Sequence, residues 1–169
     1  MKPVLSLLLL ESVLLTSVID TSQWSPASSD PSGLTYLATS RRLVVVDGEV
    51  DETRVFGGSN VFMSDITGQL QRSFSTTSYS HEPADVATDR RNNRLFISDD
   101  NKDRIFRVKV GPDHRFGTRD DQVKSFSTAS FGATDPEGLD LAKKSLQPKA
   151  RCLLVQFLAW RAVSSALQA

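Results

Sequence analysis

The chain contains 169 residues, a length that suits one domain or part of a larger one. Its 20 basic and 20 acidic residues balance, so the overall charge favours neither nucleic acid nor an anionic membrane as a partner. The single Cys152 excludes an internal disulfide framework and a cysteine-type zinc site. Two histidines leave little material for a histidine-based metal site or a catalytic triad.

The chain begins like a secretory signal, with Lys2 followed by an apolar run that extends to Leu10. Glu11 interrupts this run, and no small-x-small cleavage site follows it. A transmembrane helix needs roughly 20 unbroken apolar residues, so we expect no integral membrane span. Residues 1–11 are either an export signal, which implies a secreted or periplasmic protein, or the remnant of an upstream repeat unit.

A repeat dominates the rest of the chain. The phrases Asp-Pro-Ser-Gly, Glu-Pro-Ala-Asp and Asp-Pro-Glu-Gly place prolines at 31, 83 and 136, which are 52 and 53 residues apart. The segment Ser-Phe-Ser-Thr at 73–76 recurs 52 residues later at 125–128. A fixed period of about this size indicates a repeated supersecondary unit. The repeats predict one region over residues 12–146, with units that start near residues 30, 82 and 135.

Each unit is predicted to contain four strands, because short apolar or β-branched runs alternate with polar turns. The predicted strands are residues 34–37, 43–46, 53–56 and 69–75 in the first unit, and 86–88, 95–98, 105–110 and 122–127 in the second. Residues 12–21 align with the ends of these units, so they are predicted to be the last strand of a preceding one. Four antiparallel strands per period without a helical pattern are typical of a β-propeller blade. The predicted fold is therefore all-β, with about two complete blades plus partial ones.

The repeat stops after Leu146, and residues 147–169 form a basic and apolar tail without acidic residues. This tail is either a helix, since several apolar residues can share one helical face, or the product of a truncated or shifted reading frame. An incomplete propeller leaves open strand edges. We therefore expect marginal stability and self-association through these edges.

In each of the two complete units, one acidic loop follows the second strand. Alternate oxygen-bearing side chains on a tight loop can converge on Ca²⁺, which prefers oxygen ligands. The alternative is that the first aspartate of each loop caps turn amides, and recurrence in every unit favours this structural role. The aligned residues are Asp47, Glu49 and Asp51 in the first loop, and Asp99, Asn101 and Asp103 in the second.

A third candidate calcium site lies in residues 111–121, which contain Asp113, Asp120 and Asp121. The alternative is a long hairpin loop whose turns are set by proline and glycine. Arg115 and Arg119 would partly neutralise the three carboxylates and so weaken the metal interpretation.

Residues 30–56 and 82–108 resemble NHL-type repeats, in which a proline phrase precedes an apolar strand, a turn, a second strand, Asp and a polar loop. Residues 111–141 resemble a bacterial group of exported propeller proteins whose blades carry a G-P-D-x-x-F-G-T-x-D-D hairpin before a D-P-E-G phrase. The resemblance implies a ring, often of six blades. Related propellers include lactonases, phytases and ligand-binding modules. Glu137 is similar in position to an acidic residue that helps bind a central divalent ion in lactonase-type propellers.

These observations predict an extracytoplasmic β-propeller fragment that acts as a binding or interaction module, stabilised by calcium, for a protein or small-molecule ligand. The sequence contains no G-x-S-x-G motif that would indicate a serine nucleophile. The alternatives are a metal-dependent propeller hydrolase of lactonase or phosphoesterase type, and a non-functional truncated product.

Overall fold

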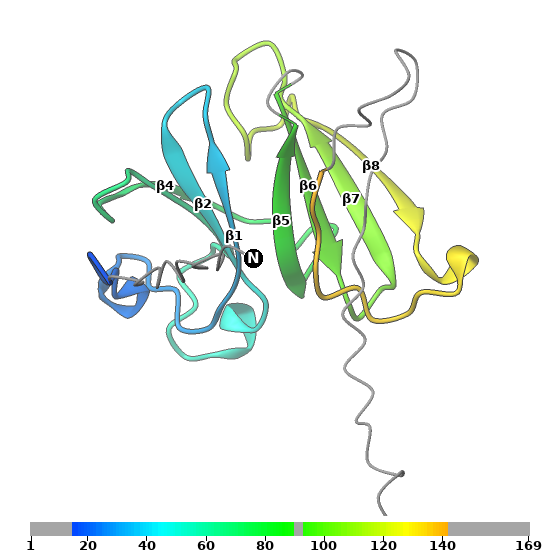
Figure 1. Cartoon of the computed structure of the whole chain (residues 1–169), viewed down its shortest axis with the longest axis horizontal. Coiled ribbons are helices and arrows are strands. Elements are labelled where there is room, and N and C mark those ends of the chain that lie inside the picture. The colour runs from blue at the N-terminus through cyan, green and yellow to red at the C-terminus, as the bar shows by residue number, and fades with distance from the viewer. Residues whose placement is uncertain (1–14, 90–92, 142–169) are drawn as a thin grey trace, which may run out of the picture.

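The computed structural model describes residues 15–89 and 93–141, which form two open four-stranded antiparallel sheets (Figure 1). Each sheet is a meander in which consecutive strands are neighbours. The first contains β1 (Pro31–Leu37), β2 (Arg42–Asp47), β3 (Val61–Ser64) and β4 (Leu70–Phe74). The second contains β5 (Pro83–Asp89), β6 (Arg94–Asp99), β7 (Arg104–Lys109) and β8 (Gln122–Ser127). Three short 3-10 helices complete the described elements: η1 (Thr21–Gln23), η2 (Val50–Glu52) and η3 (Ala129–Phe131).

The all-β expectation is confirmed, but the predicted third strand of the first unit is wrong. Residues 53–56 form turns, with Arg54 and Val55 exposed, and β3 lies at Val61–Ser64. The four residues of β3 are all buried, and Val61 pairs with Val46 of β2. Residues 61–64 are buried on both faces of the sheet, so this strand removes more apolar surface from water than the half-polar segment 53–56 could.

The two units keep a period of 52 residues although β3 is displaced, because a long loop before β3 in the first unit is matched by a long loop after β7 in the second. The starts of β1 and β5 (31 and 83), β2 and β6 (42 and 94), and β4 and β8 (70 and 122) are each 52 residues apart. The starts of β3 and β7 (61 and 104) are only 43 apart. The first unit has a long loop before β3, over residues 48–60, and the second has a long loop after β7, over residues 110–121.

The main core lies between the two sheets. Alternate residues of the strands point into it, as the period of two in a β-strand requires. Its buried members are Leu37, Val44, Val46, Val61, Met63 and Phe74 of the first unit, and Val86, Leu95, Ile97, Phe106, Val108 and Phe116 of the second. The sheets approach most closely at β1 and β5, which lie side by side near the middle of Figure 1. A Cβ added to Gly33 would lie only 2.5 Å from the Asp85 Cα, so only glycine allows the backbones to approach so closely.

Each sheet also covers part of its other face with a preceding or following segment. On the first sheet, the Trp24 ring lies 5.8 Å from the Phe62 ring, and its Nε1 donates a hydrogen bond to the Gly68 carbonyl at 2.9 Å. On the second sheet, a smaller cluster joins Ala87 and Ile105 to Leu139 of the third repeat phrase. Three repeat units therefore contribute to the packing.

Several sequence predictions concern residues that lie partly or wholly outside the described ranges. Residues 15–20 form no strand, so the predicted strand over 12–21 is wrong there; this segment instead leads into η1, which the Asp20 carboxylate caps. The proposed signal segment 1–11, the tail 147–169 and its predicted helix lie outside the described residues. Within the described residues, no helix has the length and apolar character needed to cross a membrane.

Candidate functional site

The acidic loop after β2 uses its first carboxylate to hold the surrounding chain. Asp47 is fully buried, and its Oδ2 accepts hydrogen bonds from the Ser28 hydroxyl at 2.7 Å and the Asp30 amide at 2.9 Å. Its Oδ1 accepts a third bond from the Val50 amide, at 2.9 Å, at the start of η2. Asp47 therefore satisfies the amides of the turn, as a turn-capping aspartate does.

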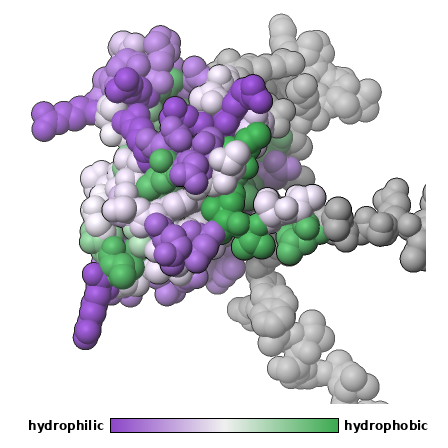
Figure 2. All heavy atoms as spheres, turned by 90° about the vertical axis from the view of Figure 1, so that its left-hand side faces the viewer, coloured by the Kyte–Doolittle hydropathy of each residue, from purple (hydrophilic) through white to green (hydrophobic). Residues whose placement is uncertain are grey.

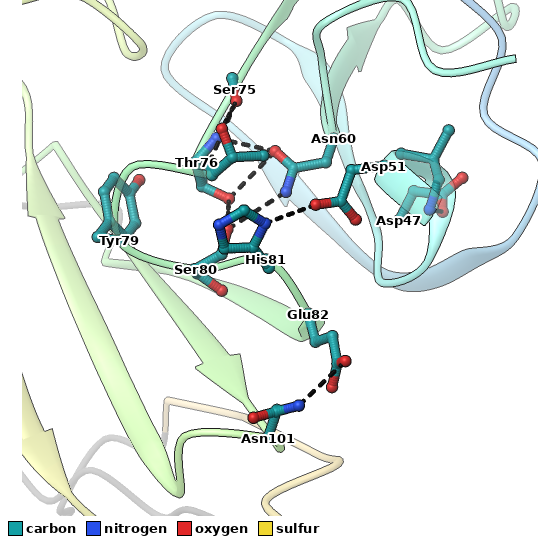
Figure 3. A network of polar contacts seen from close by, with 12 residues as sticks. Asp47, Asp51, Asn60, Ser75, Thr76, Tyr79, Ser80, His81, Glu82 and Asn101 are labelled. Atoms are coloured by element: carbon teal, nitrogen blue, oxygen red, sulfur yellow. Dashed lines mark hydrogen bonds and ion pairs between the residues drawn. The ribbon is translucent and has the colours of Figure 1, made fainter. Parts of the chain in front are cut away.

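The other two positions of this loop have different environments. Glu49 is exposed, whereas Asp51 reaches across to the second unit, with its Oδ2 2.7 Å from His81 Nδ1 (Figure 3). The His81 side chain is 61% exposed and that of Asp51 only 10%, so this pair lies at the rim of the junction between the sheets. The three acidic residues of the loop do not bring three carboxylate oxygens within 4.8 Å of one another.

The loop after β6 repeats one part of this capping arrangement, the hydrogen bond that the aspartate Oδ1 accepts from an amide three residues later. Asp99 is fully buried, and its Oδ1 accepts a hydrogen bond from the Lys102 amide at 2.7 Å. The Asn101 amide group donates to Glu82 Oε1 at 3.1 Å (Figure 3), and Asp103 Oδ1 accepts from the Asp135 amide at 2.8 Å. Both loops therefore connect one repeat unit to the start of the next.

The hairpin loop between β7 and β8 directs its carboxylates onto its own backbone. Asp121 Oδ2 accepts hydrogen bonds from the amides of Gly117 and Thr118, and burial raises the pKa of this carboxyl group. Asp120 accepts from the Thr118 hydroxyl, which lowers its pKa, and from the Asp113 amide. The loop aspartates thus shape the hairpin, and calcium binding by them remains a prediction.

A group of three acidic side chains forms elsewhere, at the junction of the second and third units. Asp100, Asp135 and Glu137 bring one carboxylate oxygen each to within 4.8 Å of one another. Among the residues that the structure describes, no other trio of acidic, histidine or cysteine side chains does so. Oxygen ligands of this kind suit Ca²⁺ or Mg²⁺.

The electrostatics of this group favour a cation. Burial raises the pKa of Asp100, and the nearby charges of Glu82 and Asp135 raise it further. A raised pKa means that the folded chain holds the ionised carboxylate at a cost, which a bound cation would reduce. Sequence reasoning singled out Glu137 but missed Asp100 and Asp135. The available signal was that the position of Asp100 is Gly48 in the first unit, so the extra carboxylate is not part of the repeated cap.

A buried polar network fixes the connection between the sheets (Figure 3). Asn60 is fully buried, and its Oδ1 accepts a hydrogen bond from the Thr76 amide at 2.8 Å. The Thr76 hydroxyl lies 3.0 Å from the Ser80 carbonyl, and the Ser80 amide donates to the Thr76 carbonyl at 2.7 Å. An equivalent clasp joins the Thr21 hydroxyl to the Ser28 carbonyl at 2.9 Å, with the Ser28 amide bonded to the Thr21 carbonyl. The connector that enters each sheet is therefore built in the same way.

Asp85 occupies the place where the first strands of the repeats come together. Its carboxylate accepts hydrogen bonds from the Val86 amide at 2.7 Å on its own strand and from the Leu139 amide at 2.7 Å in the third unit, and it lies against Gly33 of the first unit. Burial raises the pKa of Asp85, and these hydrogen bonds partly offset that effect. One side chain thus joins three successive units.

No protein-family model matches this chain, and no curated protein matches it. Inferences about its function therefore depend on the site geometry and on the repeat.

Proposed function

We propose that this chain is part of an NHL-like β-propeller and acts as an extracytoplasmic binding or interaction module, stabilised by calcium. The observation that carries this proposal is the position of Asp85, which lies against Gly33 of the first unit and accepts hydrogen bonds from the Val86 amide and from the Leu139 amide of the third unit. In a propeller, the innermost strands of successive blades gather around one central channel. Asp85 on β5 contacts β1 and the start of the third unit, and this contact between the beginnings of successive units suits such an arrangement.

The packing of the second sheet supports the same proposal. Its outer face carries Ala87 and Ile105, with Phe96 and Phe126 beside them, and Leu139 and Leu141 of the third unit rest on it. Burying this face on a further blade would extend the packing that already joins the first two sheets. The edge strands β4 and β8 are the places where open edges would pair with another chain.

We place the calcium at Asp100, Asp135 and Glu137, which belong to two successive units. A cation held there would tie the loop after β6 to the third repeat phrase. It would also reduce the repulsion among these carboxylates and Glu82, which contributes to the raised pKa of Asp100. The calcium would therefore stabilise the junction between repeats without taking part in chemistry.

The position of Glu137 in this group also favours a second candidate, a metal-dependent propeller hydrolase of lactonase or phosphoesterase type. A divalent ion bound by carboxylates can polarise a carbonyl or phosphoryl oxygen and lower the pKa of bound water. Both candidates use the same metal site, but only the hydrolase would turn over a substrate.

A calcium titration followed by thermal unfolding tests the proposal. We expect saturating Ca²⁺ to raise the Tm of the wild-type chain by roughly 5–11 °C, because a ligand at ~100 times its Kd adds roughly 2.7 kcal/mol to stability. Asp100→Asn should lose this rise, while Glu52→Gln, which changes an exposed carboxylate outside the group, should keep it.

An equal rise in wild type and Asp100→Asn, or no rise in either, would contradict the calcium site. Turnover of lactones or phosphate esters by the calcium-loaded chain, abolished in Glu137→Gln, would replace the interaction module with the hydrolase. Absence of turnover together with a calcium-dependent Tm is the expected result.

A further inference from the structure

A second region of the molecule, at the opposite end of the sheets from the acidic loops, forms a cavity of about 500 Å³. Strand β2 runs from Arg42 at the cavity to Asp47 at the acidic loop, so the strand length separates the two regions. The hairpin between β1 and β2 and the 110–121 loop flank the cavity at the top of Figure 1. Figure 2 shows that hydrophilic residues predominate at this upper end of the face in view.

The charged residues that line the cavity are arginines, and a histidine lies beside them. Arg42 comes from β2, Arg72 from β4, and His114 and Arg115 from the 110–121 loop. No aspartate or glutamate is among the described residues that line it. Within the described part of the chain, no hydrogen bond or ion pair engages the three arginine side chains. Three guanidinium groups from separate elements are thus available to one ligand.

The carboxylates of the 110–121 loop bind the loop's own backbone and form no ion pair with the arginines that line the cavity. Asp113, Asp120 and Asp121 belong to the same loop, but each accepts hydrogen bonds from loop amides. The Asp113 Oδ1 accepts from the backbone amide of Arg115 at 2.8 Å, which leaves the guanidinium of Arg115 uncommitted. His114 is held with a positive φ of 57°, so the loop presents these two basic residues from a fixed turn.

The floor of the cavity has a different character. Leu37, Met63 and Phe116 line it and are each at least 95% buried, as members of the core between the sheets. Thr39, Ser40 and Asn93 add hydroxyl and amide groups at the rim. The volume lies within the roughly 300–1,000 Å³ of ligand pockets, and the lining combines an apolar floor with a larger set of polar and charged side chains.

We propose that this cleft binds a small organic anion that carries phosphate or carboxylate groups and an apolar body. Arginine suits this role because its planar guanidinium can bind such groups through two parallel hydrogen bonds. The anionic groups meet Arg42, Arg72 and Arg115, and the apolar body rests on Phe116 and Met63. The cleft consists only of the first two units, so the inference goes beyond the proposed propeller and does not require the calcium site.

Isothermal titration of the full chain with phenyl phosphate tests this assignment, because phenyl phosphate combines both ligand features. Inorganic phosphate carries the anionic group alone, and phenol carries the aromatic ring without the phosphate. Each should bind at least tenfold more weakly than phenyl phosphate, a difference of about 1.4 kcal/mol. Arg115→Gln and Arg42→Gln should each raise the Kd for phenyl phosphate about tenfold, since each removes a charge-assisted hydrogen bond.

Arg119→Gln is the matched control, because Arg119 is an exposed arginine of the same loop that does not line the cavity. Its Kd should equal that of the wild type, and circular dichroism should show that all variants fold alike. The proposal fails if phenyl phosphate does not bind at about 10 mM, which is weaker than any specific site of this kind. It also fails if phenol binds as tightly, or if Arg119→Gln weakens binding as much as Arg115→Gln does. Isophthalate, titrated in parallel, distinguishes a carboxylate ligand from a phosphate ligand.

Discussion

At the scale of single residues, the closest contact between the sheets depends on Gly33. Its repeat counterpart in the second unit is Asp85, and the two lie against each other across the junction. A Cβ on Gly33 would lie 2.5 Å from the Asp85 Cα and 2.9 Å from Val46 Cγ2. Neither neighbour can move freely, because one is backbone and the other is a fully buried side chain. The repeat analysis identified Gly33 as part of a repeated phrase, but it could not show that Gly33 faces Asp85 of the next phrase.

Gly33→Ala should therefore lower the free energy of unfolding by about 2–3 kcal/mol, the cost of overpacking a close backbone contact. Gly48→Ala is the matched control, because the nearest atom to its added Cβ is the Ser32 hydroxyl oxygen at 3.6 Å. Urea unfolding of both variants measures the difference. Equal stability of the two alanine variants would show that β1 and β5 do not approach as closely as described.

At the scale of elements, the connector between the sheets, residues 75–82, is held in place by buried hydrogen bonds. Asn60 precedes β3 and binds Thr76, which follows β4, and its Nδ2 also donates to the Ser80 carbonyl at 3.4 Å. These bonds fix the path from the first sheet into the second. The segment that contains Thr76 recurs at Thr128, whereas Asn60 lies in a loop that the repeat does not share, so the sequence did not indicate their contact.

Asn60→Ala should lower the free energy of unfolding by about 2–3 kcal/mol, because it leaves the buried Thr76 amide without its acceptor. Gln71→Ala removes a side chain of similar polarity whose hydrogen bonds lie on the surface, at 3.4 Å, and should change stability by less than about 0.5 kcal/mol. Chemical denaturation of the two variants supplies the comparison. A loss of similar size in both would mean that the network contributes no more than a surface contact.

Strand positions could be predicted where apolar runs and turn residues agree, as at β2 and β6. They could not be predicted where two runs compete, as residues 53–56 and 61–64 do, because burial on both faces decides between them and appears only in the packed structure. The candidate site shows the same limit. Recurrence correctly indicated that Asp47 caps turn amides, but the approach of Asp100 to Asp135 and Glu137 depends on how the third unit docks.

At the scale of the whole molecule, the two ends of the sheets have different chemistry. One end carries turn-capping aspartates and the acidic group at Asp100, and the other carries the arginine-lined cleft. The second strand of each unit contributes to this difference between the two ends. Strand β2 starts at Arg42 and ends at Asp47, and β6 starts at Arg94 and ends at Asp99.

The central claim is that successive repeats pack around Asp85, and hydrogen exchange at the Leu139 amide tests it most directly. This amide donates to Asp85 Oδ2 at 2.7 Å across 54 residues of sequence, and Leu139 is buried. We expect slow exchange of the Leu139 amide in the wild-type chain, and faster exchange in Asp85→Ala while the amides of β7 stay protected. Leu139 exchange at the rate of an unstructured peptide in the wild type would contradict the packing of the third unit on the second.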